Sequence, residues 1–504
     1  MTSAQHHGVQ PHRARRRASH GIARLSARQR WLLTAAGVAN ALIFLDQTAV
    51  VVALHAIQRE FHSSTSAVQW TVGAYLLSFA ALVAGSGRLA DLYGRRRLFV
   101  CGVALFALSS AACAAAPSDL VLIVSRVFQG AAAALAQPLV LAHATAAVPA
   151  ERRGWAIGVV ASAGTSCLVI GPVLGGVIVD LLGWRWIFVL NLPLAMFSIA
   201  VATRFMPESR AAHPEPLDVP GVILLTTGLA ALVAGLLHMQ TWATGADLGT
   251  LVLGACALGA FVMVEHRSRH PLLPLTRLGK PGMLSSIAAL VSIQGSVLGV
   301  TVYLVLFLQN GLGLTAIAAG GILILAGMWT PLLSRWTGRI ADRQGARQPV
   351  GTALLAAAVG LGVLAFSAPA KQVLAIVPGL LIFGISRPFV FTPASARAIK
   401  ALPASERGLA SSLVAEARQF GAVLGVAALG TITAAFNAHG RTGASVAGIR
   451  ASMLAAAAVS LTVGILIHTG VPAIRSKRRH AAREPAHAGP SQHVVAAQPQ
   501  PETR

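Results

Sequence analysis

Charged side chains are scarce in this chain. Only 11% of its 504 residues are Asp, Glu, Lys or Arg, whereas 55% are hydrophobic. A soluble globular domain carries roughly 25% charged residues. A chain so depleted in charge cannot cover its surface against water, which excludes a soluble globular protein and predicts one that faces lipid.

Cysteine is also sparse. The chain has four cysteines, all within apolar stretches, and their spacing matches no metal-ligand pattern. A disulfide framework needs a denser set, so we expect thiols that pack like small apolar side chains, with no metal site and no cofactor. The four are Cys101, Cys113, Cys167 and Cys256.

Acidic residues are outnumbered, with 16 acidic against 40 basic side chains and a formal net charge of +24. Such an excess can indicate nucleic-acid binding. Here, however, the basic residues lie in the two tails and in short loops between long apolar runs, which is typical of loops on the cytoplasmic side of a membrane. We therefore predict that both termini are cytoplasmic and that nucleic acid is not a partner.

Long apolar runs are the main feature that is present. A helix needs about 20 apolar residues to cross ~30 Å of hydrocarbon. The first run contains Asp46 and is too long for the core of a signal peptide, so we interpret it as an uncleaved span. The fourteen predicted spans are 32–54, 68–88, 97–116, 120–142, 155–180, 186–206, 219–239, 247–264, 283–309, 317–336, 350–368, 373–394, 409–436 and 449–470.

An internal repeat divides these spans. The loop GRLADLYGRRR (87–97) after the second span is echoed by GRIADRQGA (338–346) after the tenth, and PAERRG (149–154) by PASERG (403–408) at nearly the same separation. The repeat predicts two six-helix halves, a known plan for transporters. The predicted segments are a disordered basic tail (1–28), a first half (29–206), a cytoplasmic linker (207–218), two inserted helices (219–264), a cytoplasmic loop (265–282), a second half (283–470) and a disordered tail (471–504).

The string at 87–97 resembles the loop signature of the major facilitator superfamily. Its glycines allow a tight turn and close helix approach. The carboxylate of Asp91 can pair with arginines, which would make a lock that forms and breaks as the halves rock. The resemblance implies a major facilitator fold, all α-helical in the membrane, with conformational gating by Gly87, Asp91, Gly94, Arg95, Arg96, Gly338, Asp342 and Gly345.

The fifth span resembles the antiporter signature of drug exporters in this superfamily. Proline removes one backbone donor and bends a helix, and small residues four apart let a second helix approach closely. The residues of this predicted motif are Gly164, Gly171, Pro172, Gly175 and Gly176.

Two further strings, LDQTAVVVAL (45–54) and WRWIFVLNLP (184–193), resemble the fourteen-helix drug:proton antiporter branch, the EmrB/QacA-like multidrug exporters. Asp46 lies near the middle of the first. Burial favours the protonated form of a carboxyl group and a nearby arginine favours the carboxylate, which is the opposition that a switchable proton site needs. We interpret the second string as a family marker and interfacial anchor. The branch usually has proline where this chain has His55.

Ionisable residues inside spans complete the expected coupling site. Arg126, in RVFQG (126–130), costs roughly 2.5–3.5 kcal/mol to insert and so needs a partner. Glu416 and Arg418 share another span and form either a structural ion pair or part of a proton or cation site. Residues two apart face each other poorly on a helix, which leaves room for partners on other helices. Arg387 is expected near the cytoplasmic end of its span, where it either snorkels or has a functional role.

Export of amphipathic small molecules, including cationic ones, is the function that the resemblance implies, with protons as the coupling ion and the bacterial cytoplasmic membrane as the location. We expect a monomer. An importer of the same fold and a membrane-embedded enzyme are the alternatives, but the short loops hold no catalytic cluster. The candidate cavity residues are Asn40, Gln47, Gln129, Gln137, Gln294 and Tyr303.

Overall fold

The computed structural model describes residues 25–470, apart from 150–151, 211–215, 239–244, 269–270, 274, 371, 404–405 and 437–444. The predicted disorder of the two tails falls almost wholly outside the described residues. Within them, fourteen helices are long and apolar enough to cross a membrane. The predicted all-α class with fourteen spans is therefore confirmed.

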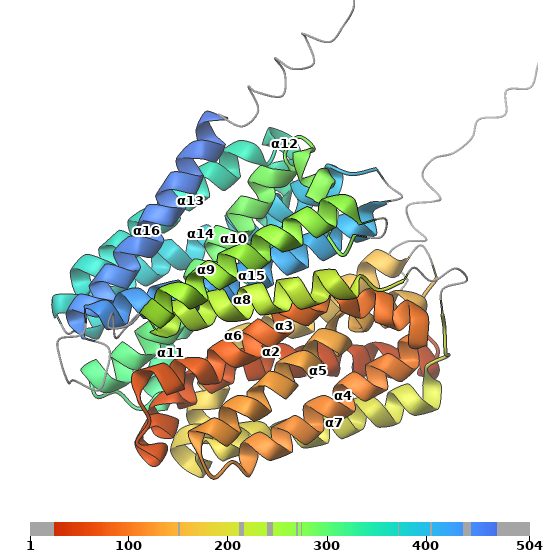
Figure 1. Ribbon diagram of the computed structural model, residues 1–504, viewed down its shortest axis with the longest axis horizontal. Helices are drawn as coiled ribbons and strands as arrows, with labels where there is room; N and C mark the ends of the chain where they lie inside the picture. The colour runs from red at the N-terminus through yellow and green to blue at the C-terminus, as the bar shows by residue number, and fades with distance from the viewer. Residues whose placement is uncertain are drawn as a thin grey trace, which may run out of the picture.

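The first half is a bundle of six helices in which α2 packs along α6, and α5 lies against both α3 and α4. Red to yellow ribbons in Figure 1 show this half. Its helices are α2 (Ala27–Phe61), α3 (Thr65–Tyr93), α4 (Arg95–Ala114), α5 (Asp119–Ala146), α6 (Arg153–Leu182) and α7 (Arg185–Phe205).

The second half repeats this plan. Here α10 packs along α15, and α13 lies against α14 and α16. Its helices are α10 (Met283–Leu306), α11 (Ala316–Gly327), α12 (Trp329–Gln344), α13 (Arg347–Ser367), α14 (Val373–Lys400), α15 (Arg407–Ala435) and α16 (Val446–Thr469). Short turns follow α9, α10 and α13 at η4 (Leu275–Gly279), η5 (Phe307–Gly311, a π-turn) and η6 (Ala368–Ala370).

The tenth predicted span is broken into α11 and α12 at Met328. Pro331 lies just beyond the break, and it has no N–H to donate to the carbonyl four residues earlier, that of Gly327. The sequence contained this proline, but we had read the span as one continuous helix.

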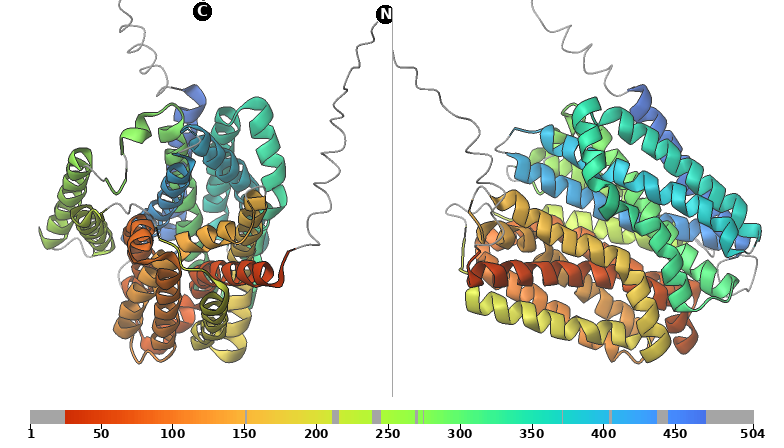
Figure 2. Two further views of the ribbon diagram at one scale, coloured as in Figure 1. Left: turned by 90° about the vertical axis from the view of Figure 1, so that its right-hand side faces the viewer. Right: turned by 180° about the vertical axis from the view of Figure 1, so that it is seen from behind.

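The inserted helices α8 (Val219–His238) and α9 (Gly245–Arg267) pack against each other, and α8 touches both α3 and α15. The left view of Figure 2 shows the pair, in green, standing at the side of the bundle. Their connections are tied to both halves. Arg88 of α3 donates to the carbonyls of Pro216 and Pro271, and Arg277 pairs with Glu406 at 2.8 Å.

Serine and threonine caps fix where several helices begin. The hydroxyls of Ser26, Ser64, Ser118, Thr315 and Ser445 each accept a backbone N–H from the first turn of the following helix. Such caps satisfy donors that have no partner within the helix. Polar caps of this kind place the helix ends, whereas apolar composition alone gives only the span.

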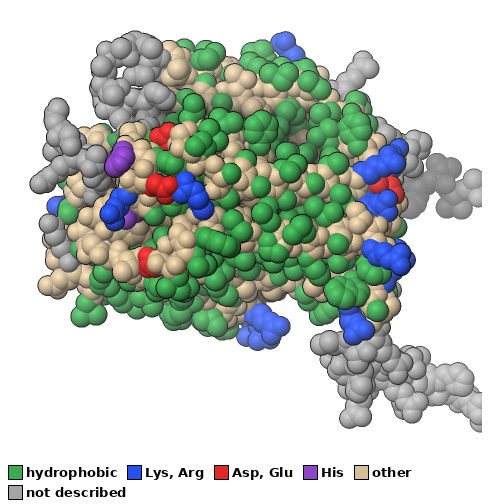
Figure 3. Space-filling model, turned by 90° about the horizontal axis from the view of Figure 1, so that it is seen from below, with side chains coloured by type: hydrophobic (Ala, Val, Ile, Leu, Met, Phe, Trp, Pro, Cys, Tyr) green, Lys and Arg blue, Asp and Glu red, His purple; other side chains and the backbone are tan. Residues whose placement is uncertain are grey.

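The surface has an apolar belt between two polar ends, as Figure 3 shows, with lysines and arginines grouped at one end. We call this end the basic face, defined by the turns between α3 and α4, α12 and α13, and α14 and α15. The other end, with the turns between α2 and α3, α6 and α7, and η5 and α11, is the opposite face. Helix α6 packs closely along α11, toward the opposite face, and much less on α12. The halves are therefore closed at the opposite face.

Glycines let α10 and α15 touch through their backbones. A Cβ added at Gly425 would collide with the carbonyl of Gly295, and one added at Gly299 would lie 2.8 Å from the carbonyl of Gly425. In a membrane, such backbone contact replaces the hydrophobic effect as the source of helix association.

Gly425→Val should lower the melting temperature of the detergent-purified protein, because overpacking of a tight contact costs about 1–3 kcal/mol. Gly362→Val in α13 is the matched control, since nothing lies within 4 Å of a Cβ at that position. Thermal unfolding followed by tryptophan fluorescence measures both. Equal melting temperatures for the two variants would contradict the packing argument.

Candidate functional site

Asp46 and Arg126 form a buried ion pair in the middle of the first half. Asp46 lies near the centre of α2 and is fully buried, and Arg126 of α5 is 1% exposed. The guanidinium Nη1 of Arg126 lies 2.5 Å from Oδ2 of Asp46. The partner that the cost of a buried arginine requires is therefore the carboxylate of the first span.

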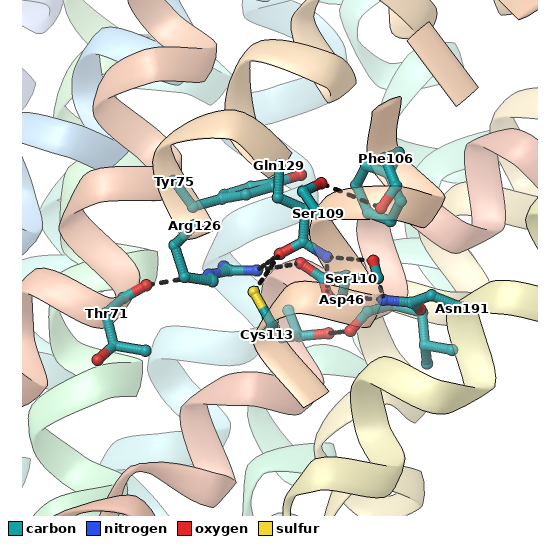
Figure 4. Close-up of polar contacts among 12 residues, drawn as sticks. Asp46, Thr71, Tyr75, Phe106, Ser109, Ser110, Cys113, Arg126, Gln129 and Asn191 are labelled. Carbon is teal, nitrogen blue, oxygen red and sulfur yellow. Dashed lines mark hydrogen bonds and ion pairs between the residues drawn. The ribbon is translucent and has the colours of Figure 1, made fainter. Parts of the chain in front are cut away.

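Amides from two other positions complete the coordination of this carboxylate, as Figure 4 shows. Its Oδ1 accepts hydrogen bonds from Gln129 Nε2 and Asn191 Nδ2, both at 3.0 Å. The same two amides donate to Ser110 Oγ at 2.7 and 3.3 Å. Asp46 thus receives three donors, from α5 and α7.

The guanidinium of Arg126 has a second set of partners. Its Nε donates to the carbonyl of Thr71 at 3.0 Å, and its Nη1 also donates to Gln129 Oε1 at 2.5 Å. The ring of Tyr75 lies beneath it, with the guanidinium carbon 4.2 Å from the ring centroid. Arg126 therefore has several partners besides Asp46.

Sequence reasoning missed part of this network. Asn191 belongs to the string 184–193, which we interpreted as a marker and anchor without a chemical role, yet its amide contacts Asp46 directly. Ser110 and Thr71 were not singled out either. The available signal was an asparagine within an apolar run, since polar residues inside the membrane face the protein interior. In the same string Trp186 is half exposed, as an anchor should be, whereas Trp184 is buried and donates to Glu60.

Glu416 of α15 is buried and Arg418 of the same helix is half buried, and the two do not form an ion pair with each other among the described residues. Arg418 Nε lies 3.5 Å from Gln294 Oε1, and its guanidinium lies over the ring of Phe391. Oε2 of Glu416 has no hydrogen-bond partner among the described residues. The prediction that two residues on one helix would face apart is consistent with this arrangement.

Arg387 does not snorkel. It lies near the middle of α14, is 6% exposed, and donates from Nη1 to the carbonyl of Ala326 at 3.0 Å. Our expectation of an interfacial arginine was wrong because we assigned the end of the span too early, at residue 394 rather than Lys400. The Ala326 carbonyl lies close to the break between α11 and α12, which exposes acceptors there.

The signature loops form ion pairs within their own halves. Asp91 accepts from Arg95 at 3.0 Å, and Asp342 from Lys400 at 2.9 Å. Gly94 and Gly345 follow at the ends of α3 and α12 with φ of 103° and 78°, a conformation that favours glycine. The backbone N–H of Arg96 donates to Glu208 of the linker at 3.1 Å. No Cβ contact would arise at Gly87, and one at Gly338 would meet only Thr392.

The glycines of α6 serve two different partners. Added Cβ atoms at Gly164, Gly171 and Gly175 would collide with Asn40, Thr48 and Ala49 of α2. One at Gly176 would collide with the carbonyl of Ala316 in α11, and Gly320 of α11 lies against the Pro172 carbonyl. The motif thus holds α6 to its own half on one side and to the second half on the other.

Most of the candidate cavity residues form hydrogen bonds within the protein. Asn40 donates to the Val160 carbonyl at 2.9 Å, and Tyr303 to that of Val426 at 2.8 Å. Gln129 belongs to the Asp46 network and Gln294 contacts Arg418. Gln47 is buried and Gln137 is half buried.

Comparison with known proteins agrees with this architecture of a polytopic membrane transporter. The family model of the Major Facilitator Superfamily matches residues 36–426, and the chain belongs to this family. It is 34% identical to the multidrug resistance protein Stp of Mycobacterium tuberculosis over 410 residues, covering 80% of this chain and 76% of that protein. The predicted family is confirmed.

Two Streptomyces proteins are also similar. The puromycin resistance protein pur8 of Streptomyces alboniger is 32% identical, with 91% of this chain and 93% of that protein covered. The tetracenomycin C resistance and export protein of Streptomyces glaucescens is 30% identical, with 80% and 75% covered. These relatives and the fourteen helices agree with the predicted branch.

Among solved structures, a D-xylose–proton symporter superposes with a TM-score of 0.61 at 15% identity, covering 87% of this chain and 96% of that one. The human organic anion transporter MFSD10 gives 0.59 at 15%, covering 87% and 99%. At this identity the likeness shows the fold alone.

Arg126→Ala should lower the melting temperature sharply, because removal of one partner from a buried ion pair costs about 3–5 kcal/mol. Adding Asp46→Asn to Arg126→Ala should recover part of the loss, since no unpaired carboxylate then remains. Thermal unfolding of the two single variants and the double variant forms the cycle. Strictly additive losses would contradict direct coupling of the pair.

Proposed function

We propose that this protein is a proton-driven exporter of amphipathic small molecules, including cationic ones, that works by alternating access in the bacterial cytoplasmic membrane. The buried Asp46–Arg126 pair is the observation that carries the proposal. Three similar proteins are named for drug resistance or export, which supports a drug-like substrate. Both termini lie in the cytoplasm in this proposal, because the basic loops are then on the cytoplasmic side. The proposed exporter works as a monomer.

Coupling follows from the partners of the pair. A proton that reaches Asp46 removes the charge that Arg126 Nη1 contacts, and the guanidinium then relies on Thr71, Gln129 and the Tyr75 ring. These partners lie on α3 and α5, whereas Asp46 lies on α2. Protonation therefore loosens α2 from α3 and α5 and favours a change in the packing of α2 against α6. Each proton entering down a membrane potential supplies about 2.3 kcal/mol per 100 mV.

We assign substrate entry to the basic face. A cavity of about 490 Å³ lies between the ends of α2 and α6 and is lined mainly by apolar groups, with Arg30 and Thr34 at its polar edge and Trp155 on α6. Ligand pockets of drug-sized molecules have volumes of roughly 300–1,000 Å³ and predominantly apolar walls. In the proposed orientation this cavity opens toward the cytoplasm, where an exporter collects its substrate.

Asp46→Asn should abolish proton-driven efflux, because the amide keeps the size and part of the hydrogen bonding of Asp46 but cannot take up a proton. Uptake of a fluorescent cationic dye into everted vesicles, energised by an imposed pH gradient, measures the effect. Asp119→Asn, which makes the same change in an acidic residue at the start of α5, is the matched control and should transport normally.

Normal efflux by Asp46→Asn would refute proton coupling through this site. The direction of transport is tested separately in whole cells. An uncoupler should raise dye accumulation if the protein exports, and should lower it if the protein imports.

A further inference from the structure

We infer that Asp180 is a latch that holds the two halves together at the opposite face, and that it must release for the transporter to open there. The inference rests on the alternating-access part of the proposed function, but on neither its substrate nor its coupling ion. Asp180 lies near the end of α6, in the first half. Its carboxylate accepts the backbone N–H of Ala316 at 3.2 Å and that of Ile317 at 2.9 Å, the first two residues of α11 in the second half.

The latch completes the N-terminal cap of a helix from the other half. The first N–H groups of a helix have no partner within the helix. Thr315 supplies one partner itself, since its hydroxyl accepts the N–H of Ala318 at 3.2 Å. Asp180 supplies the partners of Ala316 and Ile317, and its negative charge meets the positive end of the helix dipole. An end of α11 is thus satisfied only while the halves are together.

Close backbone contacts between α6 and α11 lie next to Asp180. Gly176 is pressed against the Ala316 carbonyl and Gly320 against that of Pro172, so that any opening at this face must separate α6 from α11. Gln309 adds a second bond across the interface, from Nε2 to the Val52 carbonyl at 2.9 Å. Asp180 itself is charged and exposed.

Water reaches the latch through a vestibule. A cavity of about 660 Å³ at the opposite face is lined by Asp180, Thr315 and Gln309, together with His55, Arg59 and Glu60 of α2. Glu60 forms an ion pair with Arg185, in which Oε1 lies 2.5 Å from Nη1. Because water can solvate both the carboxylate and the freed N–H groups, the latch can break without leaving buried unpaired groups. This is the property that a reversible gate requires and that a permanent structural bond does not.

The experiment measures the distance between spin labels placed on the two halves. Leu181→Cys on α6 and Leu374→Cys on α14 are both highly exposed near the opposite face, and the four native cysteines are replaced by serine in the full-length chain. Double electron–electron resonance then reports closed and open populations. Asp180→Asn should raise the open-to-closed ratio by about 2- to 30-fold, the range expected for loss of a capping and dipole interaction. Asp180→Glu should restore the ratio in part.

Thr315→Ala is the matched control. It weakens the same end of α11 by removal of a cap of similar strength, but it breaks no bond between the halves, so it should leave the distance distribution unchanged. The inference is overturned if Asp180→Asn keeps the parent distribution, or if Thr315→Ala shifts it equally. The distance measurement requires no substrate. Its result can therefore be distinguished from a failure of drug export or of proton coupling.

Discussion

The structure is organised around a buried charge pair, Asp46 and Arg126. Removing Asp46 and Arg126 from water is costly, and each is acceptable inside a membrane only because the other is present. The pair contacts Gln129 of α5, Asn191 of α7 and the Thr71 carbonyl of α3, and the two amides also contact Ser110 of α4. One ionic contact therefore fixes how five helices of the first half face one another.

Helix α6 carries the consequences of this arrangement to the rest of the molecule. One row of its glycines packs on α2, the helix that bears Asp46, and another on α11 of the second half. A change in the position of α2 therefore alters the packing of α6, which contacts α11 at the opposite face. Glycine is what makes this possible, because backbones in direct contact can slide or separate without the interdigitation of larger side chains.

The two halves repeat the same plan but not the same chemistry. In the first half, the two buried charges pair with each other, while Asn191 Oδ1 and the Tyr75 hydroxyl beside them lack partners among the described residues. In the second half, Glu416 and Arg387 are buried with atoms that lack partners among the described residues, namely Oε2 and Nε. Unpaired buried polar atoms cost free energy. A repeat in sequence therefore preserved the helices and turns, while the interior of each half took its own polar groups.

The sequence by itself determined the number of spans, the repeat, the family and the residues at which chemistry was expected. These properties are local: an apolar run of sufficient length, a glycine in a turn or a charged residue within a span can each be recognised without knowledge of neighbours. It also indicated Asp46 and Arg126 as coupling residues and showed that a buried arginine needs a partner, without pairing the two. Only the tertiary structure decided which side chains meet. The contact of Asn191 with Asp46 depends on the rotation of α7, and the burial of Arg387 depends on the true length of α14. The contact of Asp180 with α11 depends on how the two halves pack, because the residues in contact are 136 positions apart in the sequence. Helix rotation and approach are set by packing over the whole bundle, which no local pattern records.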